Sequence, residues 1–95
     1  RRFLIARDNI HQVKVEDQMK ELLTEMIQAI VDKPDEVDIS LTESENTNIF
    51  ELRLGDGDVG KVIGKKGKNV MALRTILSAA TAKAGGKRSI LEIIE

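Results

Sequence analysis

The chain has 95 residues, 41% of them hydrophobic, and this length and composition predict one soluble folded domain with a single modest core. The absence of cysteine excludes disulfide frameworks and thiolate zinc sites, and with only one histidine an enzyme is the less favoured interpretation. The net charge of −1 conceals an asymmetry: residues 60–95 carry eight basic and two acidic side chains, whereas residues 16–59 carry three basic and thirteen acidic ones, so the C-terminal part can attract phosphate.

The first predicted element is a helix from about Asp17 to Val31. Apolar residues recur there at alternating steps of three and one, which makes a single apolar stripe on a helix. The stripe comprises Met19, Leu22, Leu23, Met26, Ile27, Ile30 and Val31. Asp17 is the expected N-cap, and Pro34 is expected to stop the helix. Residues 1–16 lack a clean helical period, so we expect a flexible N-terminal extension there, with a short strand as the alternative, and a single domain over residues 17–95.

Two strands are predicted next, because apolar and polar residues alternate. The first contains Val37, Ile39 and Leu41, and the second contains Phe50, Leu52 and Leu54. A polar loop over residues 43–48 is expected to join them into an antiparallel pair. A third strand is predicted over residues 89–94, where the chain is apolar and β-branched enough to be buried on most sides.

Two helices are predicted on either side of a glycine-containing loop. A short helix spans about Asp58 to Ile63, and a long amphipathic helix follows the loop and ends at Gly85-Gly86. The apolar stripe of the long helix comprises Val70, Leu73, Ile76, Leu77 and Ala80. The order helix, strand, strand, helix, helix, strand predicts an α/β (α+β) two-layer sandwich, in which a three-stranded sheet is covered on one face by the helices.

The loop Gly64-Lys65-Lys66-Gly67 has the composition of a phosphate clamp. Its glycines permit tight, partly left-handed turns and the close approach of a sugar-phosphate backbone. The helix that begins at the loop directs its unpaired N–H groups and positive dipole end toward an anion. The two lysines of the loop add charge, with Lys61 and Lys68 within one turn, and Ile63 and Val70 would supply an apolar floor for bases.

The glycines before this loop allow other interpretations, which we consider weaker. The run from Gly55 to Gly60 fits the spacing G-x-G-x-x-G, but Asp56 and Asp58 would repel a pyrophosphate and the following helix is too short. The same two carboxylates could hold a cation, although a turn explains them more simply. The sequence therefore predicts no catalytic residue, no metal site and no cofactor.

The segment Ile63-Gly64-Lys65-Lys66-Gly67 followed by Val70 matches the I-G-x-x-G-x-x-[IV] signature, and in this the chain resembles KH domains. The element order resembles the type II arrangement, and residues from about Met19 to Glu95 are similar to the KhpA family of small bacterial stand-alone KH proteins. The resemblance implies non-catalytic binding of single-stranded RNA, as a post-transcriptional regulator or RNA chaperone. The RNA-binding residues that it implies are Gly64, Lys65, Lys66 and Gly67 in the clamp, Ile63 and Val70 in the adjacent aliphatic groove, and Lys61, Lys68 and Arg74 near its edge.

The resemblance also implies protein partners. Members of this family self-associate as homodimers and pair with a larger Jag-like protein that carries its own KH domain, but no residue here identifies either interface. A protein-interaction or dimerisation module with weak or no RNA binding is therefore the alternative function, favoured by the presence of only two aromatic residues. DNA is an alternative to RNA, because a backbone clamp need not read the 2′-OH. No apolar run approaches the roughly 20 residues of a membrane span, so we expect no membrane association and a cytoplasmic location.

Overall fold

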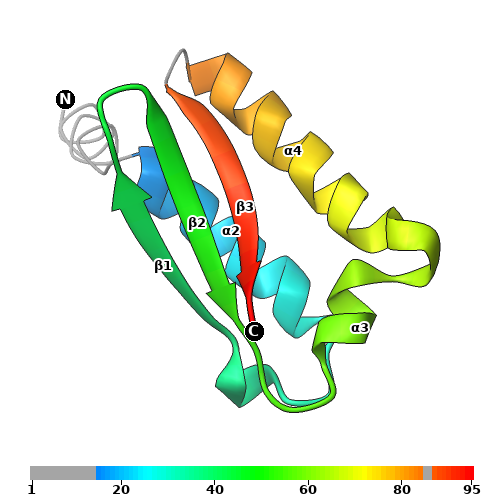
Figure 1. Ribbon diagram of the computed structural model, residues 1–95. Helices are drawn as coiled ribbons and strands as arrows, with labels where there is room; N and C mark the ends of the chain where they lie inside the picture. The colour runs from blue at the N-terminus through cyan, green and yellow to red at the C-terminus, as the bar shows by residue number, and fades with distance from the viewer. Residues whose placement is uncertain (1–14, 85–86) are drawn as a thin grey trace, which may run out of the picture.

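The computed structural model describes residues 15–84 and 87–95. The extension predicted over residues 1–16 therefore lies, except for its last two residues, outside the described part of the chain. Figure 1 labels the helices and strands. In chain order they are α2 (Val15–Gln28), a 3₁₀ turn (Pro34–Glu36), β1 (Asp38–Glu43), β2 (Thr47–Arg53), α3 (Val59–Ile63), a 3₁₀ turn (Lys65–Gly67), α4 (Lys68–Ala84) and β3 (Arg88–Ile94).

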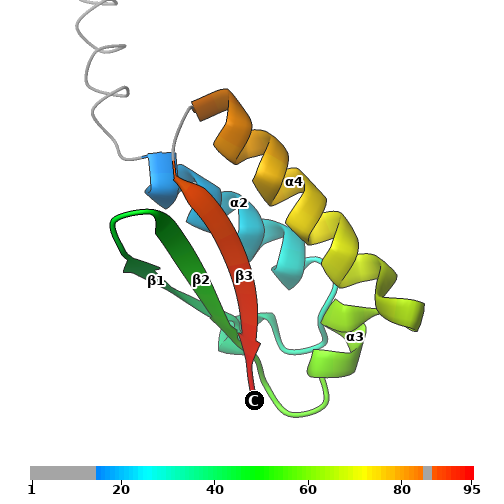
Figure 2. The ribbon, with the colours of Figure 1, turned by 45° about the horizontal axis from the view of Figure 1, so that its top comes forward.

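The described elements form two layers, as the sequence predicts. The sheet has the order β1-β2-β3, with β1 antiparallel to β2 and β2 parallel to β3. The parallel pairing requires a long crossover between β2 and β3, and α3 and α4 supply it. Helices α2 and α4 lie against one face of the sheet, and α3 lies beyond the end at which β2 and β3 finish (Figures 1 and 2). The predicted fold class and element order are confirmed.

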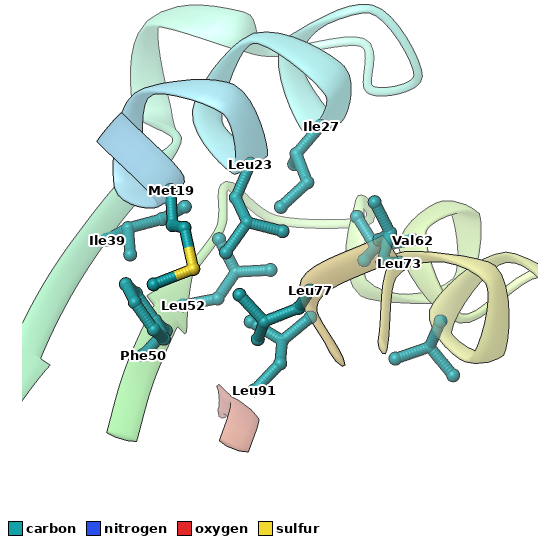
Figure 3. Close-up of a cluster of buried hydrophobic side chains, with 11 residues drawn as sticks. Met19, Leu23, Ile27, Ile39, Phe50, Leu52, Val62, Leu73, Leu77 and Leu91 are labelled. Atoms are coloured by element: carbon teal, nitrogen blue, oxygen red, sulfur yellow. The ribbon is translucent and has the colours of Figure 1, made fainter. Parts of the chain in front are cut away.

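The hydrophobic core lies between the two helices and the sheet. Figure 3 shows the side chains of Met19, Leu23 and Ile27 directed from α2 toward those of Phe50 and Leu52 on β2. The buried hydrophobic residues are Met19, Leu23, Ile27, Ile39, Phe50, Leu52, Val62, Val70, Leu73, Leu77 and Leu91. Their spacing of three and four on the helices and of two on the strands is the periodicity on which the prediction was based.

Helix α2 departs from the prediction at both of its ends. Asp17 is not an N-cap but lies within the first helical turn, because the helix already includes Val15. The helix ends at Gln28, well before Pro34, which instead begins the 3₁₀ turn. An acidic residue in the first turn is favourable both in a cap and just inside a helix, so the sequence does not distinguish the two positions.

The apolar stripes of the two long helices are wider than the surface that the sheet covers. Ile76, predicted in the core, is 41% exposed, and Leu22 and Ile30 of the α2 stripe are 42% and 36% exposed. All three lie at the margins of their stripes. Periodicity identifies the face of a helix but not how far its neighbours extend around it.

The strands also differ from the prediction in two respects. The loop expected over residues 43–48 is shorter, because Glu43 ends β1 and Thr47 begins β2. Strand β3 is not buried on most sides: it pairs with β2 alone in the described sheet, and only Leu91 of its residues is buried. Its apolar composition reflects contact with the helical layer rather than a central place in the sheet.

A buried carboxylate holds α3 against the connection between α2 and β1. Asp58, which is 1% exposed, precedes α3, and its two carboxylate oxygens accept hydrogen bonds from the backbone N–H groups of Asp32 (3.1 Å) and Lys33 (2.9 Å). The N–H of Asp58 itself donates to the carbonyl of Gly55 at 3.1 Å. Asp58 therefore has the structural role of a turn residue, and it fixes where α3 and the loop that follows it begin.

Candidate nucleic-acid interface

The loop between α3 and α4 adopts the left-handed turns that its glycines predict. Gly64 (φ 77°), Lys66 (φ 58°) and Gly67 (φ 75°) all have positive φ angles. The N–H of Gly64 donates to the carbonyl of Gly60, and the N–H of Gly67 donates to that of Gly64. The chain thus makes two tight turns within four residues and enters α4 at Lys68, with the first turn of a 17-residue helix directly beside the loop.

Two lysines are presented at the tip of this loop. Lys65 and Lys66 are exposed, and Lys68 is exposed at the first position of α4. Lys66 is the one non-glycine residue with positive φ in the described chain, a conformation that costs about 1 kcal/mol for a side chain of this kind. The lysine ammonium groups and the start of α4 concentrate positive charge on one side of the loop.

Asn69 holds the two helices together across the loop. Its side-chain amide donates to the carbonyl of Lys61 in α3 at 2.9 Å. A Cβ atom added to Gly64 would lie 2.6 Å from Cγ of Asn69, so the absence of a side chain at Gly64 makes room for this contact. Asn69 was not predicted from the sequence, although an asparagine at the start of a helix is a recognised capping signal.

The other residues predicted beside the loop differ in their exposure and in what they contact. The ammonium of Lys61 pairs with the carboxylate of Asp32 at 3.1 Å, so its charge is already partly balanced. Ile63 is 36% exposed next to the loop and offers an apolar surface to a ligand. Val70 is 7% exposed and belongs to the core, where it seats the first turn of α4 on the protein.

A groove lies between α4 and the outer edge of β3, which run side by side in both views (Figures 1 and 2). Its volume is about 500 Å³, enough for a nucleobase. The polar residues that line it are Arg74, Ser78 and Thr81 on α4 and Arg88 and Ser89 on β3, and no acidic residue lines it. Arg74 was predicted to lie at the groove edge; the three hydroxyl residues were not, because nothing in their local sequence indicates that they face the same space.

Contacts within the groove fix several of these groups. The Nη2 group of Arg74 donates to the backbone carbonyl of Leu91 at 3.2 Å. The hydroxyls of Thr81 and Ser89 lie 2.8 Å apart. Helix α4 and strand β3 are thereby joined by polar contacts at two places along the groove.

The loop and the groove are continuous along one side of α4. Met71, Arg74 and Ser78 recur at steps of three and four after the loop and share one helical face. A shallow hollow lined by Met71, Arg74, Thr75 and Ser78 lies along this face. Met71 is 64% exposed, the most exposed of the large hydrophobic residues in the described chain. Met71 was not predicted as a site residue from the sequence, and its exposure is what distinguishes it from a core methionine.

A second exposed surface lies on the other side of the helical layer. We call this surface the α2–α4 flank. It contains Leu22, Ile30 and Ile76, and a mostly apolar hollow there is lined in part by Met26, Ala29 and Ile76. About 100° separates successive helical residues, so Ile76 lies roughly 160° around α4 from Arg74. The two surfaces therefore do not overlap.

Two further features of the described residues bear on function. None of the helices between residues 15 and 84 has the length and apolar character needed to cross a bilayer. Among these residues and 87–95 there is also no group of three or more histidine or acidic side chains placed to hold a metal ion.

Comparison with known proteins gives consistent matches over most of the chain. The family model described as "KhpA/KhpB, KH domain" matches residues 20–93. A protein of Chlamydia trachomatis named "RNA-binding protein KhpA" is 43% identical over 77 residues, which cover 81% of this chain and 97% of that protein. Proteins of the same name from Clostridium acetobutylicum (45% over 76 residues; 80% of this chain, 100% of that protein) and Aquifex aeolicus (43% over 77 residues; 81% and 96%) are similar in extent.

Proposed function

Because this chain belongs to the KhpA/KhpB family of KH domains, we propose that it binds single-stranded RNA without catalysis, holding the RNA backbone at the loop Gly64–Gly67. The relatives named above are RNA-binding proteins by name. The observation that carries the assignment to the loop is its geometry: three positive φ angles and two exposed lysines directly before the start of α4. The chain is accordingly a binding protein and not an enzyme.

The loop would hold phosphates in two ways. Glycines at positions 64 and 67 leave no Cβ between the protein backbone and a sugar-phosphate strand. The exposed ammonium groups of Lys65 and Lys66 and the positive end of the α4 dipole would add charge to the hydrogen bonds of the loop, so that both act on an anion. A KH loop of this kind clamps about four nucleotides of backbone.

The bases would then lie along α4 in the groove beside β3. Met71 and Ile63 offer aliphatic surface near the loop, and Ser78, Thr81 and Ser89 offer hydrogen-bonding groups farther along. In the absence of aromatic platforms, stacking contributes less than in other single-strand binders, where it is worth about 1–3 kcal/mol per base. We therefore expect affinity to depend strongly on phosphate contacts and hence on salt.

The cellular role follows from this binding mode. We assign the protein to the cytoplasm, as a post-transcriptional regulator or RNA chaperone, because it would recognise unpaired RNA by its backbone and a few bases. A 2′-OH contact is not required by the clamp, so single-stranded DNA is the competing ligand against which RNA must be compared.

The α2–α4 flank favours a second function, the binding of a protein partner. Leu22 on α2, Ile30 in the turn after it and Ile76 on α4 are 36–42% exposed, and an exposed apolar patch is typical of a protein interface. A second copy of this chain, or a larger Jag-like KH-domain protein, is the partner we propose. The flank hollow reaches Asn69 at the start of α4, but Ile76 lies about 160° around α4 from Arg74, so a partner on the flank and bases in the groove would occupy different faces of this helix.

Titration of a short labelled single-stranded RNA with the wild type and with Lys65→Asp/Lys66→Asp tests the clamp. Aspartate tolerates the left-handed conformation of residue 66, so the double variant reverses the charge of the loop without adding backbone strain. The matched control is Lys33→Asp/Lys83→Asp, which changes the net charge equally at exposed positions away from the loop. We expect the loop variant to lose binding and the control to retain most of it.

The outcomes separate the two functions. For the wild type, the logarithm of the affinity should fall by about 0.7 per contacted phosphate for each tenfold rise in salt. Equal binding by the loop variant and the control, with both folded by circular dichroism, would reject the clamp. Absence of RNA binding by the wild type would leave partner binding as the function.

A further inference from the structure

On the edge of β3 that faces α4, one backbone carbonyl accepts a hydrogen bond from an arginine side chain. In an extended strand the N–H and C=O of one residue point to the same side, so the N–H of Leu91 faces α4 together with the carbonyl that Arg74 contacts. Arg74 covers this carbonyl with its Nη2 group at 3.2 Å. One of the two lone pairs of this carbonyl is therefore engaged by a charged donor.

The contact between Arg74 and Leu91 determines which hydrogen-bonding groups the groove offers at this point. A guanidinium has five N–H donors and no acceptor, so donors remain on Arg74 after the bond to Leu91 is made. Together with the Leu91 N–H they present several hydrogen-bond donors at this point of the groove. No carboxylate lines the groove to offset them.

Guanine and adenine differ in the acceptors that they offer to these donors. Guanine carries two adjacent acceptors, O6 and N7, which match the fork of an arginine, whereas adenine replaces O6 with an amino donor. Unpaired RNA exposes these edges to a protein groove. An amino group next to Arg74 would meet the donors of the guanidinium, which also covers one side of the Leu91 carbonyl.

We infer that Arg74, seated on the Leu91 carbonyl, is a specificity-determining residue that selects guanine over adenine at one nucleotide position in the groove between α4 and β3. This inference rests on the proposed binding of single-stranded RNA and adds to it which purine is preferred. Arg74 follows the loop by about two helical turns, so the selected base lies beyond the clamped phosphates rather than at them.

The experiment compares three nine-nucleotide uridine RNAs that carry a single central guanine, inosine or adenine. Inosine retains O6 and N7 but lacks the 2-amino group of guanine, so it tests the edge that Arg74 would contact. The variants are Arg74→Ala, which removes the donors, and Arg74→Lys, which keeps the charge but not the planar fork. The control is Arg88→Ala, which removes an equal charge from the same groove without touching Leu91.

We expect the wild type to bind the guanine and inosine RNAs roughly tenfold more tightly than the adenine RNA, the range of a bidentate arginine–guanine pair. In Arg74→Ala this ratio should fall to about one, and in Arg74→Lys to an intermediate value, because the ammonium keeps donors for O6 and N7 but not the planar fork. Arg88→Ala should weaken all three RNAs equally and preserve the ratio. An unchanged ratio in folded Arg74 variants, or a wild-type preference for adenine, would overturn the inference. Failure of the wild type to bind any of the three RNAs would instead reject the proposed function.

Discussion

Alanine substitution of three glycines near the loop should give three different changes in stability. At Gly64, φ is 77° and ψ is 169°, a conformation that side chains avoid, and the new Cβ would lie 2.6 Å from Cγ and 2.8 Å from Cβ of Asn69. Backbone strain alone costs about 1–3 kcal/mol, and the close approach to Asn69 adds to it, so we expect Gly64→Ala to lose about 3 kcal/mol.

Alanine substitution at Gly67 and Gly60 separates the cost of backbone strain from the cost of the close approach to Asn69. Gly67 has a positive φ of 75° but open space around its Cα, so Gly67→Ala should cost only the strain of a left-handed alanine, about 1 kcal/mol. Gly60 lies in α3 with open space and no positive φ, so Gly60→Ala should stabilise the protein by about 0.5–1 kcal/mol.

Thermal unfolding followed by circular dichroism measures the series. For a chain of 95 residues each kcal/mol corresponds to roughly 4–8 °C, so Gly64→Ala should melt about 15 °C below the wild type and Gly60→Ala a few degrees above it. RNA affinity should fall for Gly64→Ala and Gly67→Ala and stay unchanged for Gly60→Ala. Equal melting temperatures for Gly64→Ala and Gly60→Ala would refute the loop geometry on which this reasoning depends.

Two further predictions concern the buried carboxylate and the exposed flank. Asp58→Ala should lower the free energy of unfolding by about 3 kcal/mol, because two backbone N–H groups lose a charged acceptor. Asp56→Ala, at an exposed site in the same turn, should change it by less than about 0.5 kcal/mol. Urea unfolding distinguishes these values, and similar values for the two variants would contradict the role of Asp58. If the proposed self-association uses the flank, Ile76→Asp should abolish it in sedimentation experiments and leave RNA affinity intact, whereas Met71→Asp should weaken RNA binding alone. A loss of both activities in either folded variant would argue against separate surfaces.

The elements of the fold were predictable because each depends on local periodicity. The alternation around Phe50 and the three–four spacing around Leu23 follow from burying one face of a strand or helix, and the core confirms both. The loop was predictable for a different reason: two glycines flank two lysines at a helix start, and the positive φ angles at Gly64 and Gly67 are what glycine permits.

Features that depend on which elements become neighbours were not predictable. Asp58 was one of two candidate turn or cation residues until the carboxylate was found bound to the backbone of residues 32 and 33, some 25 positions away. Lys61 was grouped with the clamp, but its pairing with Asp32 depends on that same long-range contact. Likewise, Arg74 meets Leu91 only because the crossover lays α4 against β3, and single-sequence patterns do not encode such pairings.

Helix α4 explains how so small a domain would combine both proposed functions. Its face with Met71, Arg74 and Ser78 lines the path of the RNA, its buried face packs on the sheet, and Ile76 lies roughly 160° around the helix from Arg74. A partner bound at the α2–α4 flank would therefore leave the groove face of α4 open and, if it were a second copy, would add a second clamp. Two clamps on one RNA act at high effective concentration, which would offset the modest affinity of a single clamp without aromatic platforms. On this reasoning, disrupting the flank should weaken binding to long RNA that spans both clamps far more than binding to RNA that fits only one.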